Sequence, residues 1–184
     1  MPHPYVVSGT PQGLKNAVLV VNTDHIQVNF SDNLPHNAYY LPWQNNNYTE
    51  AVLDLNQVDL RYFFTAEFSG CSLWARFDAA TNTLTVRHES RIDQQTKAAH
   101  LNAGFSLILD SHLPGIDLQI DSNQEGEVTD KRAEYYVVHA EVMRLPDNHV
   151  LGVNFVAQLV EKRTNYTTNQ SHYAELSQFE HLLQ

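Results

Sequence analysis

The chain has 184 residues, of which 42% are hydrophobic, which is enough for one sizeable core and too few for two, so we expect a single domain over residues 1–184. Its 21 acidic and 11 basic residues give a net charge of −10, which opposes binding to phosphate backbones, so direct nucleic-acid binding is not expected. An acidic surface can instead favour a basic protein partner.

Targeting and membrane segments of the usual kinds are not visible in the sequence. Residues 1–15 lack the basic start, apolar core and small-residue cleavage site of a secretory signal peptide. No apolar run approaches the roughly 20 residues that a spanning helix requires. We therefore expect a soluble protein that has no standard leader and does not bind a membrane.

Short apolar or alternating runs, separated by Asn, Asp, Pro and Gly, predict a chain made mostly of strands. In chain order the expected strands are 17–22, 25–30, 51–55, 58–64, 72–77, 83–88, 105–109, 116–120, 134–144 and 150–160. The last two are joined by the turn-like residues 145–148, which predicts a long hairpin with a structural role.

Two segments carry apolar residues at helical spacing, 91–101 and 171–183. Their spaced residues are Ile92, Ala98, Ala99 and Leu101 in the first, and Tyr173, Leu176, Phe179 and Leu183 in the second, which Ser171 can cap. The expected fold is therefore α+β and mostly β. It is a single-domain sandwich of mixed or antiparallel sheets, flanked by one to three helices.

Cys71 is the only cysteine, which excludes an internal disulfide and disfavours a cysteine-based zinc site. The other histidines, among them His25, His100, His112 and His139, show no ligand-like spacing, so neither a metal nor another cofactor is expected. A lone cysteine is most often a small buried hydrophobe. Its neighbours in sequence decide whether it does chemistry.

The segments 72–77 and 83–88 flank a polar stretch and predict a hairpin whose register decides what lies near Cys71. If Phe77 faces Thr83, apolar residues face polar ones. If Phe77 faces Asn82, with residues 78–81 as the loop, Ala75 meets Leu84 and Leu73 meets Val86. Extended by two residues, this second register places Cys71 directly opposite His88 on one face.

A thiol beside an imidazole is the minimum set for nucleophilic catalysis, because the imidazole removes the thiol proton and the thiolate attacks a carbonyl or carboxamide. Gly70 permits a strained backbone and close substrate approach immediately before Cys71. Backbone amides around Gly70, Cys71 and Ser72 are candidates for an oxyanion hole.

A third group usually fixes the imidazole of such a pair. Thr65 is the candidate, although a purely structural strand residue fits the pattern equally well, and Ser69 and Glu67 are weaker alternatives. Trp43 and Trp74 are possible pocket residues. Ser69 is a third possible pocket residue, and each of the two tryptophans is also explained as a core aromatic.

Taken together, Phe63-Phe64-Thr65, Ser69-Gly70-Cys71 and a histidine on the next strand resemble the glutamine deamidase toxins of the Burkholderia lethal factor type. Leu41-Pro42-Trp43 resembles an upstream segment of the same family, and Phe68 stands where that family usually has Leu. The resemblance covers residues 41–88. Ser-Gly-Cys with a downstream His is more distantly similar to the catalytic domain of cytotoxic necrotizing factor.

The resemblance implies a β-sandwich toxin in which Cys71 is the nucleophile, His88 the base and Thr65 the third site residue. It also implies delivery to a host cytosol and a host protein substrate, with the RNA helicase of translation initiation favoured and a Rho-type GTPase as the alternative. Two other functions remain open from the residues: a Cys-His peptidase or amidase, and a non-catalytic β-sandwich binding module.

Overall fold

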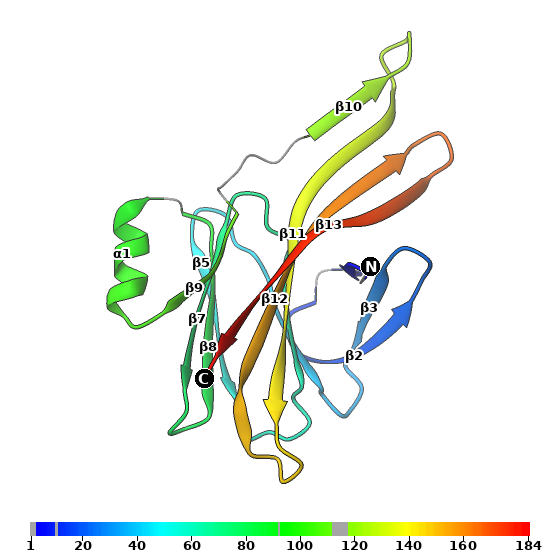
Figure 1. Cartoon of the computed structure of the whole chain (residues 1–184). Coiled ribbons are helices and arrows are strands. Elements are labelled where there is room, and N and C mark those ends of the chain that lie inside the picture. The colour runs from blue at the N-terminus through cyan, green and yellow to red at the C-terminus, as the bar shows by residue number, and fades with distance from the viewer. Residues whose placement is uncertain (1–2, 10, 92, 112–117) are drawn as a thin grey trace.

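The computed structural model of the chain describes residues 3–9, 11–91, 93–111 and 118–184. Within these ranges the protein is mostly β, with one helix, a curled nine-stranded sheet and a separate four-stranded sheet (Figure 1). The larger sheet is mixed, because β1 pairs with β3 and β4 with β6 in parallel, while its other pairings are antiparallel. A mainly β chain of the α+β class is therefore confirmed.

The nine-stranded sheet has the order β1-β3-β2-β4-β6-β11-β12-β13, and β10 pairs with the first part of β11. Its strands are β1 (Tyr5–Val7), β2 (Gly13–Val21), β3 (Ile26–Ser31), β4 (Ala38–Leu41), β6 (Tyr62–Thr65), β10 (Leu118–Ser122), β11 (Val128–Arg144), β12 (Val150–Asn165) and β13 (Gln170–Leu183). The predicted hairpin of the last part of the chain is confirmed: β11 and β12 pair from Asp130 to Arg144, and Asn148 adopts the left-handed conformation in their turn.

The smaller sheet has the order β5-β8-β7-β9, built from β5 (Tyr48–Asp54), β8 (Thr83–Glu89), β7 (Ser72–Asp78) and β9 (Ser106–Asp110). Helix α1 (Gln94–Asn102) lies beside this sheet (Figure 1). Asp93 caps it by accepting a hydrogen bond from the Thr96 amide at 2.7 Å. The helix was predicted to begin at residue 91 and begins later because the cap is Asp93.

The main core lies between the two sheets. Its members alternate along the strands, which places Leu73 of β7 and Val86 of β8 in one cluster with Phe63, Val138 and Phe155 of the larger sheet. Burying each such side chain contributes roughly 1.5–3 kcal/mol. This face of β7 and β8 is the one that carries the candidate site.

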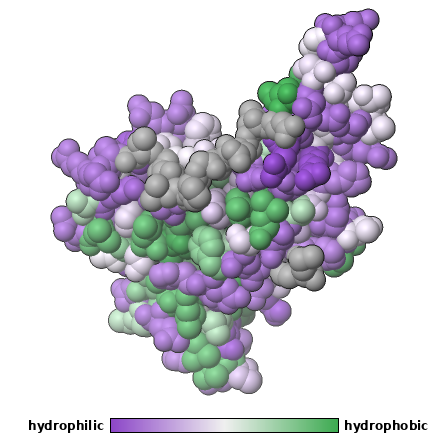
Figure 2. Space-filling model, turned by 45° about the horizontal axis from the view of Figure 1, so that its top comes forward, coloured by the Kyte–Doolittle hydropathy of each residue, from purple (hydrophilic) through white to green (hydrophobic). Residues whose placement is uncertain are grey.

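Strands β11, β12 and β13 are much longer than the core needs, and their far ends project from the body together with β10 (Figure 1). Residues 123–127, which connect β10 to β11, are all exposed. The tip of this projection is hydrophilic on the face that Figure 2 shows. The polar side chains at the tip of the projection therefore face solvent and do not cover the core.

The predicted helix over 171–183 is wrong, because this segment is β13, which pairs with β12 along its length. A register shift between Leu159 and Val160 leaves Leu176 without a direct partner, and this bulge changes the alternation midway along β13. The apolar spacing of three and four residues thus comes from a bulged strand.

Other differences concern strand limits. The predicted strand 58–64 is reduced to β6 over Tyr62–Thr65, while β2, β11 and β12 are each longer than expected. Strands β1 and β4 were not predicted. Ile92, His112 and the first residues of the expected strand 116–120 lie outside the described residues.

Candidate active site

Cys71 and His88 lie on the same face of the smaller sheet, but the predicted register is wrong by two residues. His88 pairs with Leu73, Val86 with Ala75 and Leu84 with Phe77. Cys71, just before β7, is therefore diagonal to His88 rather than opposite it. Diagonal neighbours on one face of a sheet lie about 7–8 Å apart, a distance that a long or aromatic side chain can span.

The hydrogen bonds of Thr65 fix the imidazole of His88. The Thr65 hydroxyl donates its only proton to the Leu41 carbonyl at 3.0 Å, and its oxygen lies 2.9 Å from Nδ1 of His88. Nδ1 must therefore carry a hydrogen and donate to Thr65. The other ring nitrogen, Nε2, is then an unprotonated acceptor.

Nε2 of His88 is buried and has no hydrogen-bond partner among the described residues. Cys71 therefore does not form a hydrogen bond with it in this conformation. A buried polar atom without a partner costs about 1–3 kcal/mol, and among the described residues Nδ1 of His139 and Nε of Arg144 share this state. Nε2 of His88 is therefore free to accept a hydrogen bond from a group that approaches it.

Phe68 holds the same imidazole from one side. Its ring stacks on the His88 ring with centroids 4.0 Å apart and planes 11° from parallel, and Phe68 is fully buried. His88 is itself fully buried, and this burial lowers the pKa of its imidazole to about 3. The ring therefore stays neutral at physiological pH, and its orientation is set by Thr65 at one edge and by Phe68 on one face.

Stability should fall in acid because of this histidine. His88 and the buried His139, whose pKa burial lowers to about 4, remain neutral in the folded state while an unfolded histidine protonates near pH 6.5. Below that pH the unfolded state binds more protons, so each histidine removes about 1.4 kcal/mol per pH unit until its folded pKa is reached.

Urea unfolding of the wild type and of His88→Asn at pH 7 and pH 5 measures this effect. The variant should lose less stability than the wild type between the two pH values, by the contribution of one histidine. Equal losses in the two proteins would mean that His88 is protonated in the folded state at pH 5.

Ser111 anchors the backbone just before the thiol. Its hydroxyl oxygen accepts hydrogen bonds from the amides of Gly70 at 3.2 Å and Cys71 at 2.9 Å, while the hydroxyl itself donates to the Cys71 carbonyl at 2.6 Å. The Ser111 amide donates to the same carbonyl at 3.0 Å. Gly70 has φ 149°, a conformation that side-chain-bearing residues rarely adopt, which explains a glycine here.

These bonds change the expectation for the oxyanion hole. The Gly70 and Cys71 amides already donate to Ser111, and Ser72 is a fully buried member of β7 whose hydroxyl accepts from the indole of Trp74 at 2.9 Å. A hole built from the Gly70 and Cys71 amides would require Ser111 to release them first.

A pocket of about 600 Å³ opens beside Cys71. The candidate residues that line it are Trp43, Thr65, Glu67, Ser69, Gly70 and Cys71. Asn45, Ser90 and Tyr40 add further polar groups to its wall. The structure thus brings together most of the candidates that the sequence suggested, with the thiol at the pocket wall and His88 behind it in the core.

The thiol itself is not activated in this state. Burial raises the pKa of Cys71, a hydrogen bond from Trp43 partly opposes the rise, and the Glu89 carboxylate adds to it. Alkylation of Cys71 by iodoacetamide should therefore increase with pH around a midpoint above about 8.5, the value of a free thiol. Glutathione is the reference, and a midpoint below 8 would contradict the inferred environment.

Trp74 does not belong to this pocket. It lies on the opposite face of β7, where its ring stacks on His100 of α1 with centroids 4.9 Å apart, and it is 1% exposed. Its indole bonds to Ser72. The sequence-based interpretation of Trp74 as a pocket residue is therefore wrong, and its role as a core aromatic explains its burial.

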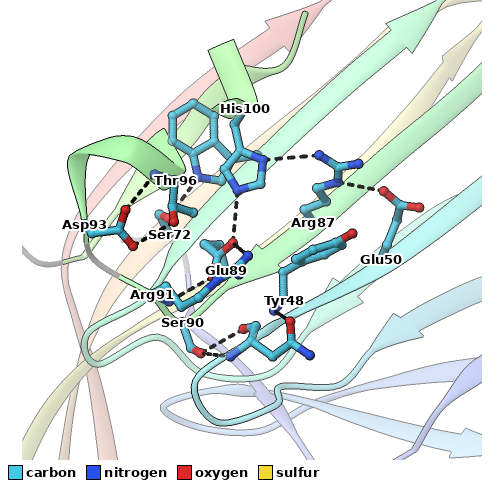
Figure 3. Close-up of polar contacts among 12 residues, drawn as sticks. Tyr48, Glu50, Ser72, Arg87, Glu89, Ser90, Arg91, Asp93, Thr96 and His100 are labelled. Atoms are coloured by element: carbon cyan, nitrogen blue, oxygen red, sulfur yellow. Dashed lines mark hydrogen bonds and ion pairs between the residues drawn. The ribbon is translucent and has the colours of Figure 1, made fainter. Parts of the chain in front are cut away.

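A buried ion-pair network lies behind the site, on this same outer face (Figure 3). The Glu89 carboxylate accepts hydrogen bonds from the Arg91 guanidinium at 2.7 and 2.8 Å and lies 3.1 Å from Nε2 of His100. Nδ1 of His100 lies 3.3 Å from Arg87, which also pairs with Glu50 at 2.6 Å. Glu89 directly follows His88, so the network fixes the end of β8.

Sequence reasoning did not find Ser111, Glu89 or the stacking role of Phe68. Ser111 lies 40 residues from Cys71, and no local pattern connects the two. Glu89 and Arg91 do carry a signal, because residues two apart on a strand share a face. Opposite charges at that spacing beside a candidate histidine indicate a pair.

Within the described ranges, no three His, Cys, Asp or Glu side chains gather in a way that could hold a metal ion. Within the same ranges no helix has the length and apolarity to cross a membrane.

No protein-family model matches this chain, and no curated protein matches it significantly in sequence. Any functional assignment therefore rests on the geometry around Cys71 and on the short motifs between residues 41 and 88.

Proposed function

We propose that the chain is a cysteine-dependent protein-glutamine deamidase with Cys71 as nucleophile and His88 as base. The observation that carries the proposal is the hydrogen bond from Nδ1 of His88 to the Thr65 oxygen, which leaves Nε2 as a free acceptor on the sheet face that also carries the only thiol. That thiol lines a pocket with Thr65. In this proposal the two sheets form the sandwich of a toxin-type deamidase.

In the proposed reaction, Cys71 gives its proton to Nε2 of His88 when a glutamine side chain enters the pocket. The thiolate adds to the carboxamide carbon, and the carbonyl electrons move to oxygen. As the tetrahedral intermediate collapses, ammonia leaves with the proton from His88 and a thioester remains. Water, deprotonated by the same nitrogen, then releases glutamate and the free thiol.

The missing Cys71 to His88 hydrogen bond fits a resting state. Catalytic hydrogen bonds in free enzymes are often long and close only when substrate binds. The raised pKa of Cys71 and the lowered pKa of His88 both favour the neutral pair, so the thiolate forms only as the proton is transferred. A protected thiol of this kind resists unwanted oxidation between turnovers.

The substrate proposed is a surface glutamine of a host protein reached in the host cytosol. The match of the Phe-Phe-Thr and Ser-Gly-Cys segments favours the RNA helicase of translation initiation, with a Rho-type GTPase as the alternative. The test incubates the wild type and Cys71→Ser with a eukaryotic lysate and measures ammonia release. Cys71-dependent ammonia release without shortening of the target supports deamidation, whereas shortened targets support a peptidase.

One observation favours a second candidate, a non-catalytic binding module. The buried thiol and imidazole are both neutral and not hydrogen-bonded to each other, as expected for two side chains that are simply packed in a core. This candidate predicts no Cys71-dependent ammonia from any lysate. It also predicts that Cys71→Ser leaves the capture of a binding partner unchanged.

A further inference from the structure

The proposed reaction needs a hydrogen-bond donor for the oxyanion, because adding the thiolate moves a full negative charge onto the former carbonyl oxygen. Donors that are already in place stabilise such a charge most, and losing one typically costs a factor of 10²–10³ in kcat. The oxyanion forms one bond away from the carbon attached to Sγ of Cys71. Its donor must therefore lie beside the sulfur and face the pocket.

The backbone amides next to the sulfur are already used. Gly70 and Cys71 both donate to the Ser111 hydroxyl oxygen, and that hydroxyl donates back to the Cys71 carbonyl. These bonds close a compact ring between the loop before β7 and the end of β9. Turning either amide towards the pocket would break a bond and leave the buried Ser111 oxygen short of a donor.

The indole of Trp43 meets both requirements. Trp43 and Cys71 line the same pocket, and the indole N–H lies close enough to Cys71 to lower the pKa of its thiol. An indole nitrogen is a donor only, so it cannot compete with His88 for the thiol proton. Trp43 is 48% exposed and lines the pocket, so a bound substrate can reach this side chain.

The chain around Trp43 is held to the site from both sides. Leu41, at the end of β4, accepts from the Thr65 hydroxyl at 3.0 Å and from the Ala66 amide at 3.2 Å. The Pro42 carbonyl accepts from the Thr49 hydroxyl at 2.5 Å. Thr65 therefore positions the imidazole and the start of the Trp43 loop together, so the base and the indole share one anchor.

We propose that Trp43 is a catalytic residue whose indole N–H donates to the substrate oxygen in the shared pocket and stabilises the oxyanion of the tetrahedral intermediate. The inference rests on the proposed deamidation. In the step, the sulfur electron pair forms the new bond to carbon and the carbonyl π pair becomes the oxyanion that the indole binds. When the electron pair on oxygen re-forms the carbonyl, the carbon–nitrogen bond breaks and ammonia leaves with the proton that His88 donates.

Two replacements remove the N–H donor, and the second of them keeps the bicyclic ring. Trp43→Phe keeps an aromatic ring, and β-(3-benzothienyl)alanine at position 43, with sulfur in place of N–H, keeps the shape of the indole. Each should lower kcat for ammonia release by about 10²–10³ with little change in KM, because the bond exists only when charge develops. Trp74→Phe is the matched control, since its indole bonds to Ser72 outside the pocket.

The pH dependence separates oxyanion binding from a simple effect on the thiol. If Trp43 only favoured the thiolate, the loss in kcat would disappear at a pH where Cys71 is ionised in both proteins. An oxyanion donor predicts that the loss persists there. Thermal melting of each variant confirms that equal folded fractions are compared.

Cys71→Ser is assayed in parallel to keep the two proposals distinct. Wild-type activity that Cys71→Ser abolishes and the benzothienyl replacement leaves intact at every pH would overturn the role of Trp43 while the deamidase proposal stands. Wild-type protein that releases no Cys71-dependent ammonia would overturn the deamidase proposal and the role of Trp43 with it.

Discussion

Replacing His88 by Asn is expected to lower the rate of Cys71-dependent deamidation by about 10³–10⁴-fold. The asparagine amide can keep the donation to Thr65 at the position of Nδ1, but it has no group at the position of Nε2. Without that acceptor the thiol, whose pKa burial raises, has no group to take its proton, and ammonia has no donor when it leaves.

His139→Asn is the matched control for His88→Asn. His139 is as buried as a core residue, its pKa is also lowered, and its ring packs against Tyr5 with centroids 4.2 Å apart. It lies on the face of β11 opposite to Val138, which belongs to the core cluster of Cys71. Per folded molecule, this variant should retain wild-type activity, and equal losses in the two variants would mean that the site does not depend on Nε2 of His88.

Replacing Glu89 by Ala is expected to cost about 3–5 kcal/mol of unfolding free energy, the largest stability effect in the site region. The carboxylate is 1% exposed and accepts hydrogen bonds from Arg91, with His100 at 3.1 Å. Its removal leaves a guanidinium and an imidazole without their shared acceptor. The melting temperature should fall by roughly 6–15 °C for a domain of this size.

Glu50→Ala serves as the control because Glu50 belongs to the same network but is 34% exposed at its side chain. A partly exposed pair of this kind contributes about 0–1 kcal/mol. Urea titration of the two variants gives both values directly. Similar small losses for Glu50 and Glu89 would contradict the structural role assigned to the buried carboxylate.

Alternation along strands accounts for how much of the site could be predicted. The apolar rows of residues 73–77 and 84–86 indicated which residues of the hairpin share a face, and Cys71 does share a face with His88. Both the predicted and the observed registers satisfy those rows. The choice between them depends on the turn, which the apolar pattern does not report.

The turn decides the register through its own hydrogen bonds. Asp78 accepts from the Ala80 amide at 2.9 Å, and Asn82 takes the left-handed conformation with φ 50°. Residues 79–82 therefore form the loop and Asp78 pairs with Thr83. Asp at the start of a turn and Asn in a left-handed position are both favoured, so turn chemistry outweighs strand pattern here.

Long-range pairing accounts for what could not be predicted. The short strands β1 and β4 each pair in parallel with a strand distant in sequence, and Ser111 reaches Cys71 across 40 residues. Such contacts leave no local pattern. Thr65 is the exception, because the motif that carries it predicts a contact with His88, and its oxygen lies 2.9 Å from Nδ1 of that residue.

The most direct test of Cys71-dependent deamidation is a peptide map of a eukaryotic lysate treated in water enriched in oxygen-18 with wild type, Cys71→Ser or His88→Asn. Hydrolysis of a thioester on Cys71 predicts at least one glutamine that becomes glutamate and gains one heavy oxygen, with wild type only. The absence of any such site, or an identical set of sites with Cys71→Ser, would contradict a reaction centre at Cys71.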